Sequence, residues 1–183
     1  SFRTEVKIAY DNHAIYVLAI MHDPHPDSIY RQLGLRDSEN LNADMFSIEF
    51  DTYNNQLDAY SFRVTASGTQ LDARESDETY NAVWESKTRI TDEGWVAELK
   101  IPYSALRFAH AESQIWGLEI SRSIRRYRET SQWSLESLEA SNDLPYWGEL
   151  HGIQNIDPPV RLSISPYTVL HAEHFPAENN SSA

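Results

Sequence analysis

Residues 83–101, VWESKTRITDEGWVAELKI, decide the fold of this chain. In the second half of this stretch, Trp95, Leu99 and Ile101 fall on one side, while Glu98 and Lys100 fall on the other. Alternation with a period of two is the pattern of a β-strand that is buried on one face. Turn residues 91–94 separate this half from residues 83–90. We therefore expect two antiparallel strands joined as a hairpin.

The same period of two extends through the rest of the chain. Further strands are expected at residues 6–10, 15–21, 46–50, 60–64, 116–120 and 147–150. About eight short strands separated by turns, with no segment long enough for a crossover helix, are typical of an all-β antiparallel β-sandwich. The expected core consists of Val6, Ile8, Val17, Phe46, Ile48, Phe50, Phe62, Val64, Trp95, Leu99, Leu118 and Ile120.

Composition excludes several classes of protein. The chain has 183 residues and a formal net charge of −13, from 15 basic and 28 acidic residues. A nucleic acid is therefore not an expected partner, since nucleic-acid affinity comes largely from clustered cations. With no cysteine, disulfides, thiolate metal sites and cysteine nucleophiles are excluded.

Several short motifs occur in an informative order along the chain. They are residues 4–8 (TEVKI), 50–54 (FDTYN), 91–95 (TDEGW), 101–108 (IPYSALRF) and 116–118 (WGL). Together they resemble a family 9 carbohydrate-binding-module-like domain, as found N-terminal to an outer-membrane β-barrel in uncharacterised bacterial proteins. Residues 159–167 are similar to the start of that barrel region.

The resemblance implies a jelly-roll-like sandwich of the carbohydrate-binding-module type. It also implies a non-catalytic carbohydrate-binding-like module in the bacterial cell envelope, in the periplasm or at the outer-membrane surface. A glycan and the protein's own C-terminal barrel are the implied partners. The alternative is a structural or assembly domain attached to the barrel that has no sugar ligand. Such modules usually open with a further N-terminal segment that does not precede the first strand here, and its absence could expose a sheet edge or part of a binding face.

Charged residues are expected on the non-core face of the central strands. By alternation, Glu49 and Asp51 share a side of one strand, while Arg63 and Glu119 lie on the non-core sides of theirs, and Arg125 extends that face. Carboxylate and guanidinium groups can hydrogen-bond sugar hydroxyls in fixed directions. Cross-strand ion pairs on a solvated sheet are the alternative interpretation.

Tryptophan rings supply the apolar platforms on which sugars stack. Trp95 and Trp116 lie in strongly apolar strands and are assigned to the core. Trp84, Trp133 and Trp147 have less apolar surroundings and are the candidate ligand-binding aromatics, with a packed rim position as the alternative.

No catalytic group, metal ligand or cofactor is assigned from the sequence. Glu49 and Asp51 are spaced like a glycosidase pair, but this spacing occurs in many strands. Two oxygen-rich loops, 37–44 and 51–58, leave a structural calcium ion open, although the first lacks the EF-hand glycine and terminal glutamate.

A domain boundary is expected at Asp157-Pro158-Pro159, because consecutive prolines remove backbone donors. Residues 1–157 are assigned to the sandwich. Residues 158–183 are assigned to a linker, the start of the barrel region and a polar tail. Alternation at residues 161–170 predicts one more strand, which is expected to pair within the barrel in the full-length protein. In the isolated chain it could add to a free edge of the sandwich, which we favour, pair with another molecule or stay mobile.

Overall fold

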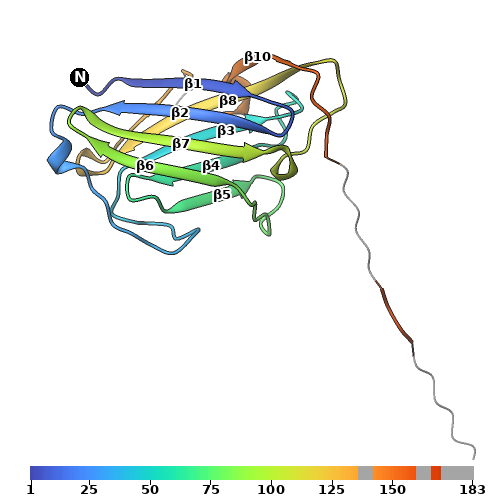
Figure 1. Cartoon of the computed structure of the whole chain (residues 1–183), viewed down its shortest axis with the longest axis horizontal. Coiled ribbons are helices and arrows are strands. Elements are labelled where there is room, and N and C mark those ends of the chain that lie inside the picture. The colour runs from blue at the N-terminus through green and yellow to red at the C-terminus, as the bar shows by residue number, and fades with distance from the viewer. Residues whose placement is uncertain (136–141, 160–165, 170–183) are drawn as a thin grey trace, which may run out of the picture.

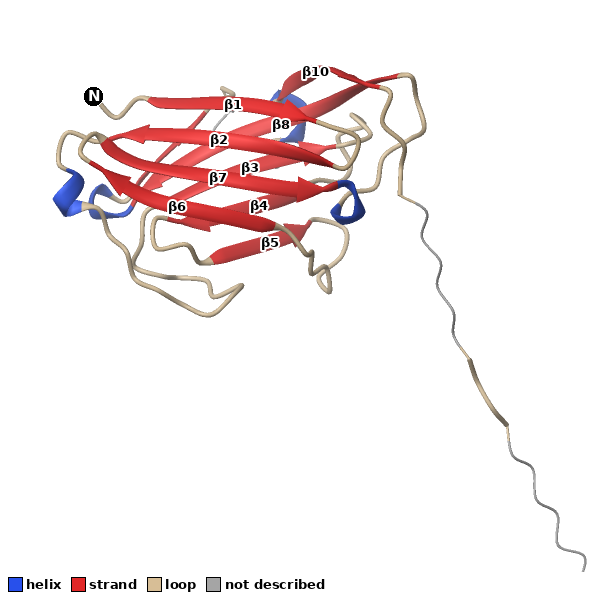
Figure 2. Cartoon of the chain, viewed as in Figure 1, coloured by secondary structure: helices blue, strands red, loops and turns tan. Residues whose placement is uncertain are grey.

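The computed structural model describes residues 1–135, 142–159 and 166–169. Two antiparallel sheets lie face to face in these residues, so the predicted sandwich is confirmed (Figure 1). The described residues contain four 3-10 turns, which lie in the connections between strands; helical turns are blue in Figure 2. The expected strand at residues 161–170 lies largely outside the described residues.

The first sheet has four strands in the order β1-β2-β7-β6. Their bounds are β1 (Thr4–Tyr10), β2 (Ala14–His22), β7 (Gly94–Pro102) and β6 (Glu85–Thr91). The hairpin predicted at residues 91–94 is confirmed, since β6 and β7 pair from Thr91 opposite Gly94. β2 is apolar on both faces and is a central strand, while β1 lies at an edge.

The second sheet has the order β10-β8-β3-β4-β5, and β9 also pairs with β8. Its strands are β10 (Gly148–Gln154), β8 (Ser113–Ile124), β3 (Met45–Asp51), β4 (Tyr60–Thr65), β5 (Gln70–Arg74) and β9 (Glu129–Gln132). The 3-10 turns are η1 (Pro26–Ser28), η2 (Tyr103–Ala105), η3 (Arg125–Tyr127) and η4 (Leu144–Tyr146). Neither β5 nor β9 is expected from the alternation of the sequence.

The core lies between the sheets and is the predicted one. Nine of the twelve expected residues are buried, and Val6, Ile8 and Ile120 are half-buried and pack against them. Aromatic rings meet edge to face within the core, as where Phe50 lies 5.9 Å from Trp116 between ring centroids. Such pairs add roughly 0.5–1.5 kcal/mol beyond the burial of their area.

Gly94 allows β7 to begin directly beside the end of β2. Its φ is +142°, and a Cβ atom there would clash with the Met21 carbonyl oxygen and lie 2.8 Å from the Asp23 nitrogen. We expect Gly94→Ala to lower the free energy of unfolding by about 2–3 kcal/mol, because backbone strain and a backbone clash coincide. Denaturant unfolding measures this.

Gly152 is the matched control for this substitution. It also has a positive φ, +91°, but an added Cβ would meet no atom within 4 Å. Gly152→Ala should therefore cost only the backbone strain, on the order of 1 kcal/mol. Equal losses in the two variants would contradict the clash at Gly94.

Candidate functional site

The outer face of the six-stranded sheet collects most of the charged residues predicted for ligand binding. Glu49 on β3 stands opposite Glu119 on β8 and Ser61 on β4. Two residues earlier on β3, Ser47 stands opposite Arg63 on β4. The alternation of these strands therefore places Glu49, Arg63 and Glu119 as neighbours on one face, as the sequence predicts.

A cleft of about 290 Å³ opens on this face between the strands and the loop at residues 38–43. Arg63 and Arg125 line the cleft from different elements, and Met45, Leu71 and Ser123 also line it. We call it the arginine cleft. Its combination of apolar side chains and charged donors is typical of small-molecule sites.

The two guanidinium groups differ in how firmly they are held. Arg125 donates its Nε–H to the Asn42 side-chain oxygen at 3.1 Å, and its backbone N–H to Asp44 at 3.0 Å. The Nε atom of Arg63 is buried and has no hydrogen-bond partner in the described part of the chain. An unpaired buried donor is costly, so an acceptor that reached the Nε atom of Arg63 would stabilise this side chain.

Glu49 extends this polar face toward β8. Burial raises the pKa of its carboxyl above the ordinary value, and the nearby charges of Asp143 and Glu119 act in the same direction. The Ser47 hydroxyl donates to Glu49 at 3.0 Å, and Arg63 also favours the charged form. Glu49 is half-buried and can accept a hydrogen bond from a ligand hydroxyl.

Glu119 and Asp51 serve the fold rather than a free binding surface. The buried Glu119 carboxylate accepts from the backbone N–H groups of Ile120, Trp133 and Ser134. Asp51 is also buried, and it accepts from the backbone N–H groups of Tyr53 and Gln56. Each carboxylate thus holds a neighbouring segment of chain in place.

The expectation that Trp84 lies outside the core is wrong. It is 5% exposed, packs edge to face on Phe62, and donates its indole N–H to Asp72 at 3.0 Å. Asp72, a buried residue of β5, thus supplies the acceptor that satisfies the indole N–H of Trp84 in the core. Trp95 and Trp116 are fully buried, as predicted.

The other two candidate tryptophans lie near the start of β10. Trp133 is 56% exposed, and its ring packs against Gly148. It lines a separate cavity of about 240 Å³ with Val6 and Ile120, which belong to the core side of the sheets. Trp147 is half-buried, and its Nε1 has no partner among the described residues. Neither tryptophan lines the arginine cleft.

The oxygen-rich loops are held by the protein's own donors. Asp37 accepts from the Asp72 backbone N–H at 3.0 Å, and Asp58 forms an ion pair with Arg74 at 2.6 Å. Within residues 1–135, 142–159 and 166–169, no three His, Cys, Asp or Glu side chains are grouped to hold a metal ion.

Sequence reasoning missed the loop that closes the arginine cleft. Ser38, Glu39, Asn40 and Leu41 all line the cleft, and Asn40 has a φ of +60°. Asparagine adopts this left-handed conformation more readily than most residues. The stretch Asp37-Ser38-Glu39-Asn40 could therefore have indicated a tight turn, but not the strand that it covers.

Comparisons with known proteins identify the family and the fold of this chain. A family model described as "Carbohydrate family 9 binding domain-like" matches residues 1–142. No protein of curated function matches the chain at a significant level. In the described part of the chain, no helix is long and apolar enough to cross a membrane.

Solved structures share the fold. A family 9 carbohydrate-binding module from Caldicellulosiruptor kristjanssonii in complex with cellotriose has a TM-score of 0.60 and 19% identity, covering 89% of this chain and 80% of that one. Its complex with glucose gives a TM-score of 0.59 and 18% identity, with coverage of 85% and 80%. A crystal structure from Bacteroides uniformis gives a TM-score of 0.66 and 12% identity, with coverage of 81% and 77%.

Proposed function

Because the chain belongs to the carbohydrate family 9 binding-domain-like family, we propose that it is a non-catalytic module that binds a glycan in the arginine cleft. The observation that carries this assignment is a cleft lined by two guanidinium side chains, of which Arg63 has a buried Nε atom with no hydrogen-bond partner among the described residues. Solved modules with the same fold hold cellotriose and glucose, which makes these two sugars the first probes.

The cleft supplies the groups that recognise a sugar. The guanidinium groups of Arg63 and Arg125 donate hydrogen bonds in fixed directions, and Glu49 is an acceptor farther along the same face. Met45 and Leu71 offer an apolar surface to the C–H groups of a sugar ring. No aromatic side chain is among the described residues that line the cleft, so polar contacts carry the recognition.

Replacing Arg63 tests this proposal. We expect Arg63→Ala to weaken the binding of cellotriose by about 10- to 100-fold, because hydrogen bonds from a charged donor contribute roughly 1.5–3 kcal/mol. Isothermal titration calorimetry of both sugars, supported by a glycan array, measures the loss. Arg128→Ala is the control, since Arg128 is exposed and its side chain makes no ion pair among the described residues.

Two outcomes would count against the proposal in different ways. Unchanged sugar affinity in Arg63→Ala would move the site away from the arginine cleft. If no glycan bound at millimolar concentration, the assembly-domain alternative would become the better explanation of this chain.

We also propose a place for the module in the bacterial cell envelope, N-terminal to an outer-membrane barrel. The resemblance of residues 159–167 to the start of such a barrel region supports this proposal. The coding sequence downstream of this chain tests it: a long series of ~10-residue alternating strands is expected. A downstream soluble catalytic domain would contradict it.

A further inference from the structure

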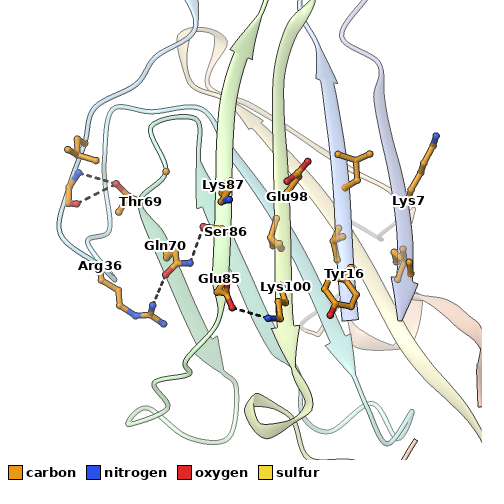
Figure 3. Close-up of a pocket in the computed structure, with 18 residues that line it drawn as sticks. Lys7, Tyr16, Arg36, Thr69, Gln70, Glu85, Ser86, Lys87, Glu98 and Lys100 are labelled. Carbon is orange, nitrogen blue, oxygen red and sulfur yellow. Dashed lines mark hydrogen bonds and ion pairs between the residues drawn. The ribbon is translucent and has the colours of Figure 1, made fainter. Parts of the chain in front are cut away.

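A second hollow lies on the opposite side of the sandwich, over the outer face of the four-stranded sheet (Figure 3). It has a volume of about 850 Å³ and crosses β1, β2, β7 and β6, ending against the loop that contains Arg36 and the turn before β5. We call it the lysine groove. It shares no lining residue with the arginine cleft.

The strand register sets the residues along this groove in two rows. One row runs through Ala9, Tyr16, Lys100 and Glu85, and the other runs through Lys7, Leu18, Glu98 and Lys87. Each row crosses all four strands. Three spacings of ~4.8 Å give each row a length of ~14 Å. The groove therefore suits an elongated ligand rather than a single small molecule.

The groove is cationic in a strongly acidic chain. All three lysines of the chain, Lys7, Lys87 and Lys100, line it, while the net charge of the whole chain is −13. Lys100 pairs with Glu85 at 3.1 Å. The ammonium groups of Lys7 and Lys87, at the two ends of one row, make no ion pair or hydrogen bond within the described residues. They are thus available to anionic groups of a ligand.

Between these two cations, the groove offers an apolar surface and an acceptor. Leu18 and Tyr16 are half-buried on β2, and the Tyr16 hydroxyl donates to Asp11 at 2.9 Å, which restrains the ring. Glu98, on β7, can accept from hydroxyl groups. Sugar rings carry both features that this arrangement matches, an apolar C–H face and a hydroxyl edge.

The backbone disfavours a peptide as the occupant. β2 and β7, which form the middle of the groove floor, are each paired with a strand on both sides. Their backbone donors and acceptors are therefore used within the sheet, whereas peptides that add to a sheet need a free edge. Recognition in the groove must come from side chains.

We propose that the lysine groove is a second binding surface, for a linear acidic oligosaccharide whose carboxylates pair with Lys7 and Lys87. Its central sugar packs on Tyr16 and Leu18 and donates hydroxyl hydrogen bonds to Glu98. This site is independent of the arginine cleft and of the neutral sugars proposed for it.

The test reverses the charge of Lys7 and Lys87 in the full chain. We expect Lys7→Glu/Lys87→Glu to weaken binding of galacturonate and mannuronate trisaccharides by about tenfold or more. Added salt should weaken the binding of the unaltered chain. Arg31→Glu/Arg128→Glu makes the same change in net charge at exposed positions outside the groove and should bind as the unaltered chain does.

Amine-selective labelling followed by mass spectrometry gives a second readout that needs no variant. Either acidic trisaccharide should protect Lys7 and Lys87, and cellotriose should not. The proposal is overturned if both acidic probes fail to bind, if the lysine variant keeps its affinity, or if cellotriose protects the lysines equally. Because Arg63→Ala leaves the groove intact, its effect on cellotriose separates a failure of the arginine cleft from a failure here.

Discussion

Replacing Arg122 with alanine should lower the free energy of unfolding by about 3–5 kcal/mol, because it removes one of the two cations that balance the buried carboxylates of Asp23 and Asp44, the other being Arg126. Arg122 lies on the core side of β8 and is 1% exposed. Its Nη1 donates to the carbonyl oxygens of Phe2 and His22, at 3.1 and 2.9 Å. Its positive charge acts on the buried carboxylates of Asp23 and Asp44, and the Asp23 Oδ2 atom lies 3.9 Å from its Nη2 atom.

The loss of stability caused by Arg122→Ala should also depend on pH. Burial raises the pKa of Asp44, while the backbone N–H of Arg125 and the charges of Arg126 and Arg122 oppose this rise. Without Arg122, the pKa of Asp44 rises further. A folded-state pKa above the unfolded value means that folding takes up a proton, so stability increases as the pH falls through it. The difference in unfolding free energy between the unaltered chain and Arg122→Ala should therefore be smaller at pH 5 than at pH 7.

Urea unfolding at both pH values measures this deficit. Arg128→Ala provides the control and should change stability by no more than about 0.5 kcal/mol, because Arg128 is exposed. A deficit below about 1 kcal/mol, or one that widens at lower pH, would show that the buried charges do not depend on Arg122.

Trp116→Ala should destabilise the domain by a similar amount, about 3–5 kcal/mol. The ring is fully buried, with centroids 5.9 Å from Phe50 and 5.4 Å from Phe108, and its indole N–H donates to Gln114 at 3.2 Å. The substitution removes this packing and leaves the Gln114 oxygen without that donor. Guanidinium unfolding gives the change in stability.

Trp95 offers a matched comparison for the contribution of the indole hydrogen bond of Trp116 to stability. It is equally buried, but its indole N–H has no partner in the described part of the chain. Trp95→Phe removes an unpaired donor, whereas Trp116→Phe breaks a hydrogen bond, so the second should cost more. Equal costs for the two phenylalanine variants would contradict a stabilising role for the contact with Gln114.

The sandwich could be predicted because its central strands repeat one pattern. Phe46, Ile48 and Phe50 alternate with polar residues, and this alone fixes which side of β3 faces the core. β5 escapes prediction because a buried Asp72 interrupts its pattern, and β9 because all four of its residues are exposed. The burial of Arg122 could not be predicted for the same reason as that of Asp72. A charged residue at a core position interrupts the alternation and looks like a residue on the solvent face.

For the candidate site, the sequence predicts only which face of each strand a residue lies on. Alternation places Glu49 and Arg63 correctly, but which strands are neighbours depends on pairing across the chain. Trp84 illustrates this limit: it lies just before β6, and the acceptor for its indole N–H is Asp72, twelve positions earlier on β5. The arginine cleft depends in the same way on a loop that returns over β3 and β4.

The confinement of every lysine to one sheet has a practical consequence for how this domain is attached to a surface. Reagents that couple lysine amines, on sensor chips or beads, will anchor it through the outer face of the four-stranded sheet, alongside any coupling at the N-terminal amine. For the molecules attached through lysine, the opposite face is the one left open to captured molecules. Attachment by a terminal tag leaves both faces in solution, so the difference between the two immobilisation chemistries reports what the lysine-bearing face contributes.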